Sequence, residues 1–234
     1  MTSAPPAAPE RDPRLERLLT LTDGVYAIDL TLLALQMSLP EGAADLQGKA
    51  LLASLLATWP KVLGYLTSFT VIAVYWAAHH RTFQFVRRFD GGLLWLQLLQ
   101  LGCISFLPFP TAVLGEHVGD PVAQLFYWGS LLLTGLVTAA LWRYVSSGHR
   151  LVDPSLSVQV IRHYNRLTLA APVAFLLIMG LIVVGVGRIV NPILLGYLLA
   201  LGYIILAVYE WWEPREALPH AQEPRPPHEE WREN

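Results

Sequence analysis

Charged residues and cysteines are scarce in this chain. Only 15% of its 234 residues are Asp, Glu, Lys or Arg, whereas 54% are hydrophobic and the mean hydropathy is +0.44. Soluble domains carry about a quarter of charged residues, so this composition is typical of an integral membrane protein. The single cysteine, Cys103, excludes an intrachain disulfide. A net charge of −2 without a basic run argues against binding of nucleic acid.

Catalytic and cofactor-binding motifs are also lacking. The sequence contains no Gly-x-Ser-x-Gly elbow, no His-Glu-x-x-His motif and no Walker loop. His79 and His80 are adjacent, and adjacent side chains on a helix point in different directions, so this pair is a poor metal site. The Thr-Val-Gly-Tyr-Gly filter of carbonyl-lined potassium pores is absent as well. We therefore predict that the protein is not an enzyme and binds no cofactor or metal.

Long apolar runs dominate the rest of the chain. A helix needs ~20 residues to cross a hydrocarbon core ~30 Å thick. The runs predict an all-α membrane protein with six transmembrane helices, at residues 20–39, 49–80, 93–113, 122–144, 167–187 and 192–212. We expect the second to be one long helix bent near Pro60. Residues 14–212 then form a single membrane domain, and the proline-rich stretches 1–13 and 213–234 are predicted to be disordered tails.

Basic residues are distributed unevenly between the two sides of this six-helix layout. Most arginines fall on the side of the two termini, while Lys49, Lys61 and Arg188 fall on the other. The positive-inside rule therefore predicts that both termini are cytoplasmic. No cleavable signal peptide is evident, so we expect the first helix to direct the chain into the membrane as a multi-pass protein.

Residues 20–39 are the most informative stretch, because they have the length of a membrane helix yet contain Asp23 and Asp29. Ionisable groups at that depth are rare and functional. Plotting the helix at ~100° per residue reveals one purely apolar stripe. The stripe consists of Ile28, Leu32 and Leu35. Asp23 points away from it, whereas Asp29 lies on its flank.

Two motifs carry a resemblance to a known family. Residues 16–18 read Glu-Arg-Leu, residues 21–28 read Leu-Thr-Asp-Gly-Val-Tyr-Ala-Ile, and residues 31–33 read Thr-Leu-Leu. Residues 76–81 read Trp, two residues, His-His-Arg. This pattern resembles the first two helices of the prokaryotic endosomal/lysosomal-type potassium channels, the transmembrane protein 175 family. Its first helix has Phe-Ser where this chain has Leu21-Thr22.

The resemblance implies a potassium-permeable cation channel built as a homotetramer, with four first helices around a central pore. Matching positions of the family form three apolar layers of a constriction: Ile28, Leu32 and Leu35. Thr31 would offer a hydroxyl between these layers. The family also implies a structural or gating hydrogen-bond network at the cytoplasmic ends of the first two helices, made of Arg17, Asp23 and His79 or His80. The partners are then potassium and other monovalent cations, the lipid bilayer and other copies of the chain.

The expected constriction works by excluding water. A ring of four branched aliphatic side chains leaves a hole too small for a hydrated ion and too apolar for stable water, which gives a hydrophobic gate. Conduction therefore requires the ring to widen. Discrimination between cations would reflect how much water each must shed, which disfavours sodium relative to potassium.

Two other functions stay open from the residues alone. A proton-coupled secondary transporter would use Asp23 and Asp29 as proton carriers, although the six predicted helices contain no internal repeat. A membrane scaffold would use the apolar stripe only for helix packing and would carry no ion flux.

Asp29 is the clearest departure from the family pattern, which usually has a small or apolar residue there. We predict a buried acid beside the pore. Because an unpaired carboxylate at that depth costs several kcal/mol, we expect a protonated side chain that donates a hydrogen bond to a partner such as Thr67 or Ser68. The alternative is an ionised carboxylate that adds negative potential beside the stripe.

Overall fold

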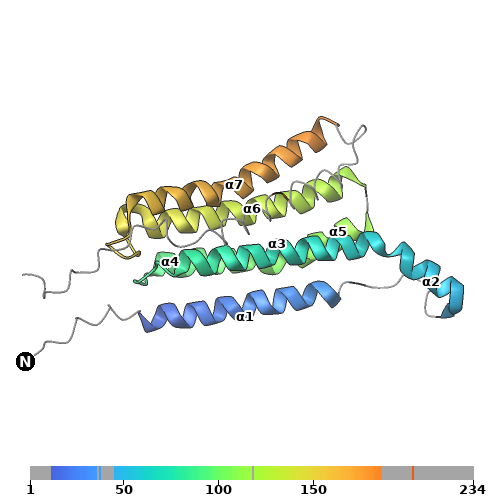
Figure 1. The fold of residues 1–234 in the computed structure, drawn as a ribbon, viewed down its shortest axis with the longest axis horizontal. Coiled ribbons are helices and arrows are strands. Elements are labelled where there is room, and N and C mark those ends of the chain that lie inside the picture. Colours follow the sequence, from blue (N-terminus) through green and yellow to red (C-terminus); the bar gives the residue numbers. More distant parts are fainter. Residues whose placement is uncertain (1–11, 36, 38–44, 118, 186–201, 203–234) are drawn as a thin grey trace, which may run out of the picture.

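The computed structural model describes residues 12–35, 37, 45–117, 119–185 and 202, and this part of the chain is helical (Figure 1). Its helices are α1 (Pro13–Leu35), α2 (Gly48–Ala57), α3 (Trp59–Phe83), α4 (Gly91–Phe106), α5 (Pro108–Glu116), α6 (Pro121–Ser146), the short 3₁₀ helix η2 (Ser147–His149) and α7 (Val158–Val183). Among the described residues, β-pairing is limited to an isolated antiparallel bridge between Val86 and Val152. The all-α class predicted from the sequence is confirmed for these residues.

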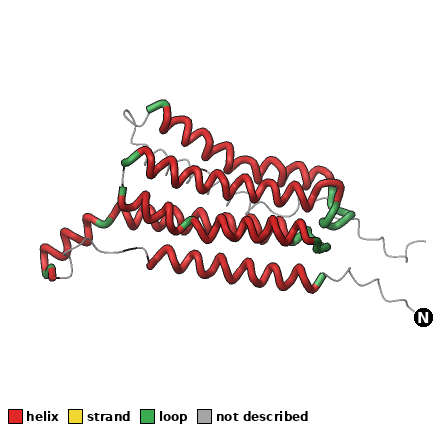
Figure 2. The backbone as a smooth tube through the Cα atoms, turned by 180° about the vertical axis from the view of Figure 1, so that it is seen from behind, coloured by secondary structure: helices red, strands yellow, loops and turns green. Residues whose placement is uncertain are grey.

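Five stretches of the described chain are long and apolar enough to cross a membrane: Pro13–Leu35, Trp59–Phe83, Gly91–Glu116, Pro121–His149 and Val158–Val183. They run side by side in both views of the bundle (Figures 1 and 2). The predicted sixth span, 192–212, lies outside the described residues apart from residue 202. The tail 213–234 and most of the tail 1–13 also lie outside them.

The predicted single helix over residues 49–80 is wrong, because the chain forms two helices that break at Thr58. Pro60 lies in the first turn of α3, where its missing N–H is not needed, whereas the interior of a continuous helix would lose a hydrogen bond there. The shorter helix α2 buries none of its residues. It extends beyond the end of the bundle, so α3 alone crosses it (Figure 1).

Two other predicted boundaries also change. The third span continues through Pro108 and Pro110, because both prolines lie in the first turn of α5, which follows α4 after Leu107. The helix predicted at 167–187 instead begins at Val158, where the Ser157 hydroxyl accepts a hydrogen bond from the backbone N–H of Val160, and ends at Val183. The pattern of apolar residues predicted both spans with the wrong bounds, because polar caps and helix-initiating prolines, rather than apolar residues, set where helices begin.

The buried apolar side chains form two clusters along the bundle. The larger one joins α1, α3, α4, α6 and α7 around Tyr26, Ile72, Ile104, Leu131 and Phe175. The second lies at the end of the bundle where α1 begins, and it includes Leu15, Phe83, Leu93, Trp142 and Val152. α1 packs against α3, α4 and α5, and it forms the edge of the bundle opposite α7 (Figure 1).

A set of contacts that we call the loop clasp joins the α3–α4 loop to the α6–α7 loop. Asp90 caps α4 by accepting from the Leu93 N–H at 2.8 Å, and it also accepts from the Tyr144 hydroxyl at 2.9 Å and from Arg150 at 3.1 Å. Arg87 pairs with Asp153 at 3.4 Å beside the Val86–Val152 bridge. The clasp fixes the ends of α3, α4, α6 and α7 relative to one another.

The clasp carboxylates are stabilised in their ionised form. Partial burial works against the charge of Asp90, but the donors from Leu93, Tyr144 and Arg150 outweigh it and hold the pKa of Asp90 below its usual range. The hydroxyl and N–H of Ser155, followed by Arg87, lower the pKa of Asp153 in the same way. Both groups lie in loops at the end of the bundle.

Candidate pore-lining face and its supports

α1 has one buried face and one exposed face. The buried residues are Leu15, Leu18, Thr22, Tyr26, Asp29 and Leu33. On the other face the three stripe residues are open: Ile28 is 59% exposed, Leu32 is 40% exposed and Leu35 is 79% exposed. Gly24 extends the open face, since no atom beyond its chain neighbours and its own helix backbone lies within 4 Å of where its Cβ would be. Three large apolar side chains on an unpaired face of an edge helix need either lipid or another protein surface to cover them.

Thr31 lies on the exposed face between the stripe residues. Its hydroxyl donates to the backbone carbonyl of Ile28 at 2.7 Å, as threonines inside helices often do. A hydroxyl that donates one hydrogen bond still has oxygen lone pairs that can accept others or coordinate a cation. The side chain therefore keeps an acceptor on this face.

Asp23 is tied to α3 by a tryptophan. The indole Nε1–H of Trp76 donates to Oδ1 of Asp23 at 2.9 Å, and the Trp76 ring lies 5.7 Å from the ring of His80. Arg17 is exposed and forms no ion pair with any described residue. Trp76 is therefore the residue that joins Asp23 to His80 in the expected cluster. The sequence did not identify it as the partner of Asp23, although it lies in the same motif as the two histidines.

His79 points into the bundle, whereas its neighbour His80 is exposed. The imidazole Nε2 of His79 lies 3.1 Å from Oε1 of Gln97 on α4, and the amide Nε2 of Gln97 donates to the Thr22 hydroxyl on α1 at 3.0 Å. The ring also stacks on Phe83, with centroids 3.9 Å apart. His79 therefore links α3 to α4 and, through Gln97, to α1, which the sequence did not reveal because Gln97 lies in a separate apolar run.

Asp29 is buried on the inner face of α1, with 2% of its surface exposed. Its Oδ2 accepts a hydrogen bond from the Ser105 hydroxyl of α4 at 3.3 Å. The expected partner Ser68 instead bonds to Tyr127 and Thr111, at 3.0 and 2.9 Å. The predicted contact with the second helix is wrong, because the flank that carries Asp29 faces α4 rather than α3.

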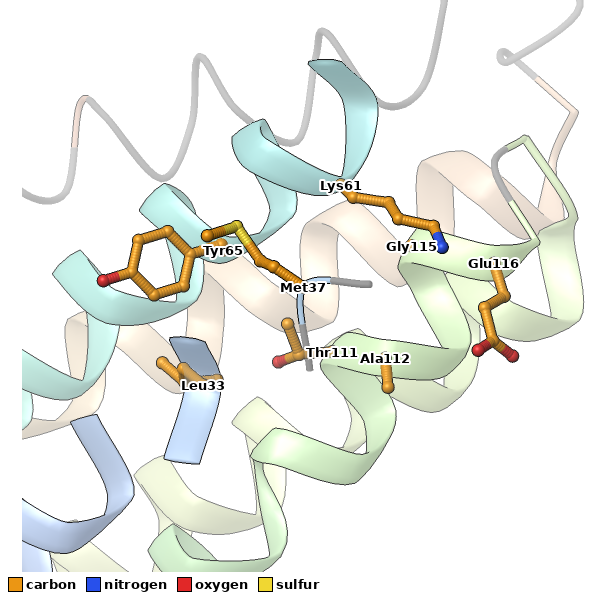
Figure 3. A pocket seen from close by; sticks show the side chains of 8 residues that line it. All are labelled: Leu33, Met37, Lys61, Tyr65, Thr111, Ala112, Gly115 and Glu116. Carbon is orange, nitrogen blue, oxygen red and sulfur yellow. The ribbon is translucent and has the colours of Figure 1, made fainter. Parts of the chain in front are cut away.

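A small cavity of about 30 Å³ opens at the end of α1 that is farthest from Pro13. Leu33 of α1 and Met37, which follows α1, form one side, Lys61 and Tyr65 come from α3, and Thr111 and Glu116 come from α5 (Figure 3). The volume suits about one water molecule. The cavity lies between the end of α1, the start of α3 and α5.

Comparison with known proteins places these features in a family. The model described as endosomal/lysosomal potassium channel TMEM175 matches residues 17–108. A potassium channel of Chamaesiphon minutus is 38% identical over 148 residues, which cover 62% of this chain and 72% of that protein. A potassium channel of Streptomyces collinus is 35% identical over 150 residues, covering 62% of this chain and 71% of that protein. The chain belongs to the TMEM175 family.

A solved TMEM175 structure supports the fold over most of the chain. It is described as a lysosomal potassium-selective channel TMEM175 homologue from Chamaesiphon minutus, and it matches with a TM-score of 0.65 at 29% identity, covering 85% of this chain and 96% of that chain. The resemblance to the family inferred from the motifs is therefore confirmed. The family match over residues 17–108 covers α1 from residue 17 onward and all of α2, α3 and α4, and so every predicted site residue, whereas α6 and α7 lie beyond it.

Proposed function

We propose that this protein is a potassium-permeable cation channel in which four copies of α1 surround a central pore. The observation that carries the proposal is the open face of α1, where Ile28, Leu32 and Leu35 are exposed while the opposite face is buried. The potassium channels among its relatives and the motifs of α1 support the same assignment. A ring of these side chains forms the constriction, and it conducts when the four helices move apart and let water enter.

The surrounding residues have supporting roles in this proposal. Thr31 places a hydroxyl oxygen between the apolar layers, where it stabilises a partly dehydrated cation. Asp23 with Trp76, and Thr22 with the Gln97 that His79 orients, hold α1 against its own subunit and so set its distance from the axis. Arg17 and His80 remain available at that end of the bundle for contacts with a neighbouring subunit. A charge-assisted hydrogen bond there would couple subunits during opening.

The proposed orientation places both termini in the cytoplasm of a bacterial cell and the protein in its inner membrane. The end of the bundle that contains the start of α1 and the loop clasp is rich in arginine, whereas Lys49 and Lys61 lie at or beyond the other end. The arginines at the first end are Arg14, Arg17, Arg81, Arg87, Arg88, Arg143, Arg150, Arg162 and Arg166. An excess of basic residues marks the cytoplasmic side.

Single-channel recording of purified protein in planar bilayers tests the function. We expect resolvable unitary currents and a reversal potential that favours potassium over sodium. A secondary transporter turns over too slowly to produce unitary steps, and a scaffold produces no flux. Either result would overturn the proposal. A native mass measurement should give four copies of the chain.

Shortening the stripe tests the constriction itself. Ile28→Ala and Leu35→Ala should each raise the unitary conductance several-fold and weaken discrimination between potassium and sodium, because each ring loses four branched side chains. Leu99→Ala is the matched control, since Leu99 is a similarly exposed aliphatic residue (54%) on α4. If the stripe variants only lower the yield while conductance and selectivity stay at the control values, α1 does not line the pore.

A further inference from the structure

Two side-chain hydrogen bonds form a polar seam between α1 and α4. Thr22 and Asp29 lie seven residues apart on α1, and their partners Gln97 and Ser105 lie eight residues apart on α4, so each helix turns twice between the two bonds. Leu101 fills the same face of α4 between them. The seam carries one ionisable group, Asp29, which lies within the candidate span Pro13–Leu35.

Asp29 and Tyr26 both have hydrogen-bonding capacity that no described residue uses. A carboxylate can accept about four hydrogen bonds, yet Asp29 has one described donor, Ser105, at 3.3 Å. A hydroxyl that donates to an ionised carboxylate normally lies ~2.5–2.7 Å from it, so this contact is too long for a charge-assisted hydrogen bond. One turn earlier on the same face, the Tyr26 hydroxyl is fully buried and has no described partner.

We infer that Asp29 is a proton-binding site within each subunit, completed by Ser105 and Tyr26, whose occupancy sets how tightly α1 is held against α4. With the proton bound, the carboxyl group can accept from Ser105 and donate to a nearby acceptor such as the Tyr26 hydroxyl. Without it, a buried negative charge depends on one hydroxyl, and the site must admit water or let α1 move. Ser105 is exposed at the surface of the isolated subunit while Asp29 beneath it is 2% exposed, so the proton reaches the carboxyl group past the Ser105 hydroxyl.

No charged group compensates this site from the helices around it. The titratable or charged side chains that α3, α4 and α5 carry are Lys61, Tyr65, Tyr75, His79, His80, Arg81, Cys103 and Glu116. Lys61, Tyr65 and Glu116 border the cavity at the far end of α1, and His79 is bonded to Gln97 near the other end. Asp29 forms no ion pair with any described residue. A proton is therefore the one cation that this site holds without further ligands, since a metal ion would require several more oxygen atoms.

Infrared difference spectroscopy of the purified protein tests proton binding without relying on conduction. Spectra recorded between acidic and alkaline buffer should contain the carbonyl band of a protonated carboxyl group, and Asp29→Asn should remove part of that band. Glu116→Gln, an acid on α5 outside the seam, is the matched control for exposed carboxyl groups. If the band is the same in Asp29→Asn as in the parent, the inference is wrong.

Electrical recording tests the effect on α1 and rests on the proposed channel function. The parent current should depend on pH, and Asp29→Asn, which is permanently neutral, should lose that dependence and resemble the parent in acid. Tyr26→Phe keeps the ring and removes the hydroxyl, so it should shift the pH response to more acidic buffer even if Asp29→Asn fails to assemble. Unchanged pH responses in both variants would overturn the inference. Infrared evidence of the proton without any cation current would retain the site and overturn the channel.

Discussion

The α6–α7 pair and α1 are attached to the bundle in different ways. α6 and α7 meet through close packing, with the rings of Trp128 and Phe175 5.8 Å apart and those of Trp142 and Tyr164 5.4 Å apart. α1 relies on one buried stripe and on three separated hydrogen bonds to side chains of Trp76, Gln97 and Ser105. Dense packing resists displacement, whereas separated polar contacts can be exchanged one at a time. In the proposed channel, this difference makes the α6–α7 pair a fixed frame and α1 the helix that we expect to move.

Gly135 allows α6 and α7 to approach each other closely. A Cβ at this position of α6 would lie 3.0 Å from Cγ of Pro172 on α7 and 3.1 Å from the Tyr75 hydroxyl. The proline ring therefore packs directly on the α6 backbone. Pro172 lies inside α7, where its missing N–H removes a hydrogen bond from the helix. α7 diverges from α6 toward its C-terminal end (Figure 1).

The largest effect on stability should come from filling that contact. Gly135→Ala should lower the free energy of unfolding by about 1–3 kcal/mol relative to Gly129→Ala, because the neighbouring ring cannot yield easily. Gly129 is a matched control on the same helix, since its Cβ would meet only the flexible end of Met179 at 3.7 Å. Thermal unfolding in detergent measures both variants. Equal melting temperatures would show that the frame is not tightly packed here.

A smaller effect is expected from cutting the bond that holds α1 to α3. Asp23→Asn and Trp76→Phe should each destabilise the protein, and a double-mutant cycle should give a coupling energy of about 0.5–3 kcal/mol. The open probability should change while the reversal potential stays constant, because Asp23 lies off the stripe. Trp95→Phe on α4 is the control, since Trp95 is 72% exposed. A shifted reversal potential in Asp23→Asn would place this carboxylate in the ion path.

The smallest effect should come from the loop clasp and should depend on pH. The pKa of Asp90 is lowered in the folded protein, so its stabilising effect is present above the unfolded value of ~3.9 and is lost as the pH falls through the folded value. Asp90→Asn should cost about 0.5–1 kcal/mol at neutral pH and show a weaker loss of stability on acidification. Melting curves across an acid series measure this. A variant that matches the parent at neutral pH would show that the clasp adds no stability.

Local patterns in the sequence were sufficient to predict where most of the membrane spans lie and which face of α1 is exposed. The apolar runs predicted a span at each of α1, α3, α4–α5, α6 and α7, although the break between α2 and α3 and the start of α7 were not predicted. The 3.6-residue period separated the exposed stripe of Ile28, Leu32 and Leu35 from the side of α1 that packs. The motif around Asp23 and His79 identified the family. These features are encoded within single helices, where spacing along the chain specifies which side chains share a face.

The partners of those side chains were decided by tertiary structure. Asp29 was expected to meet Ser68 but meets Ser105, and His79 is bonded to Gln97, because the rotation of each helix about its axis depends on packing against all its neighbours. The close contact of Gly135 with Pro172 likewise joins residues from different helices. Sequence by itself determined where the apolar spans lie and which faces are apolar, since both follow from local spacing. The side-chain pairs that tie α1 to α3 and α4 exist only once the helices are assembled, because no spacing within one helix specifies the rotation of another.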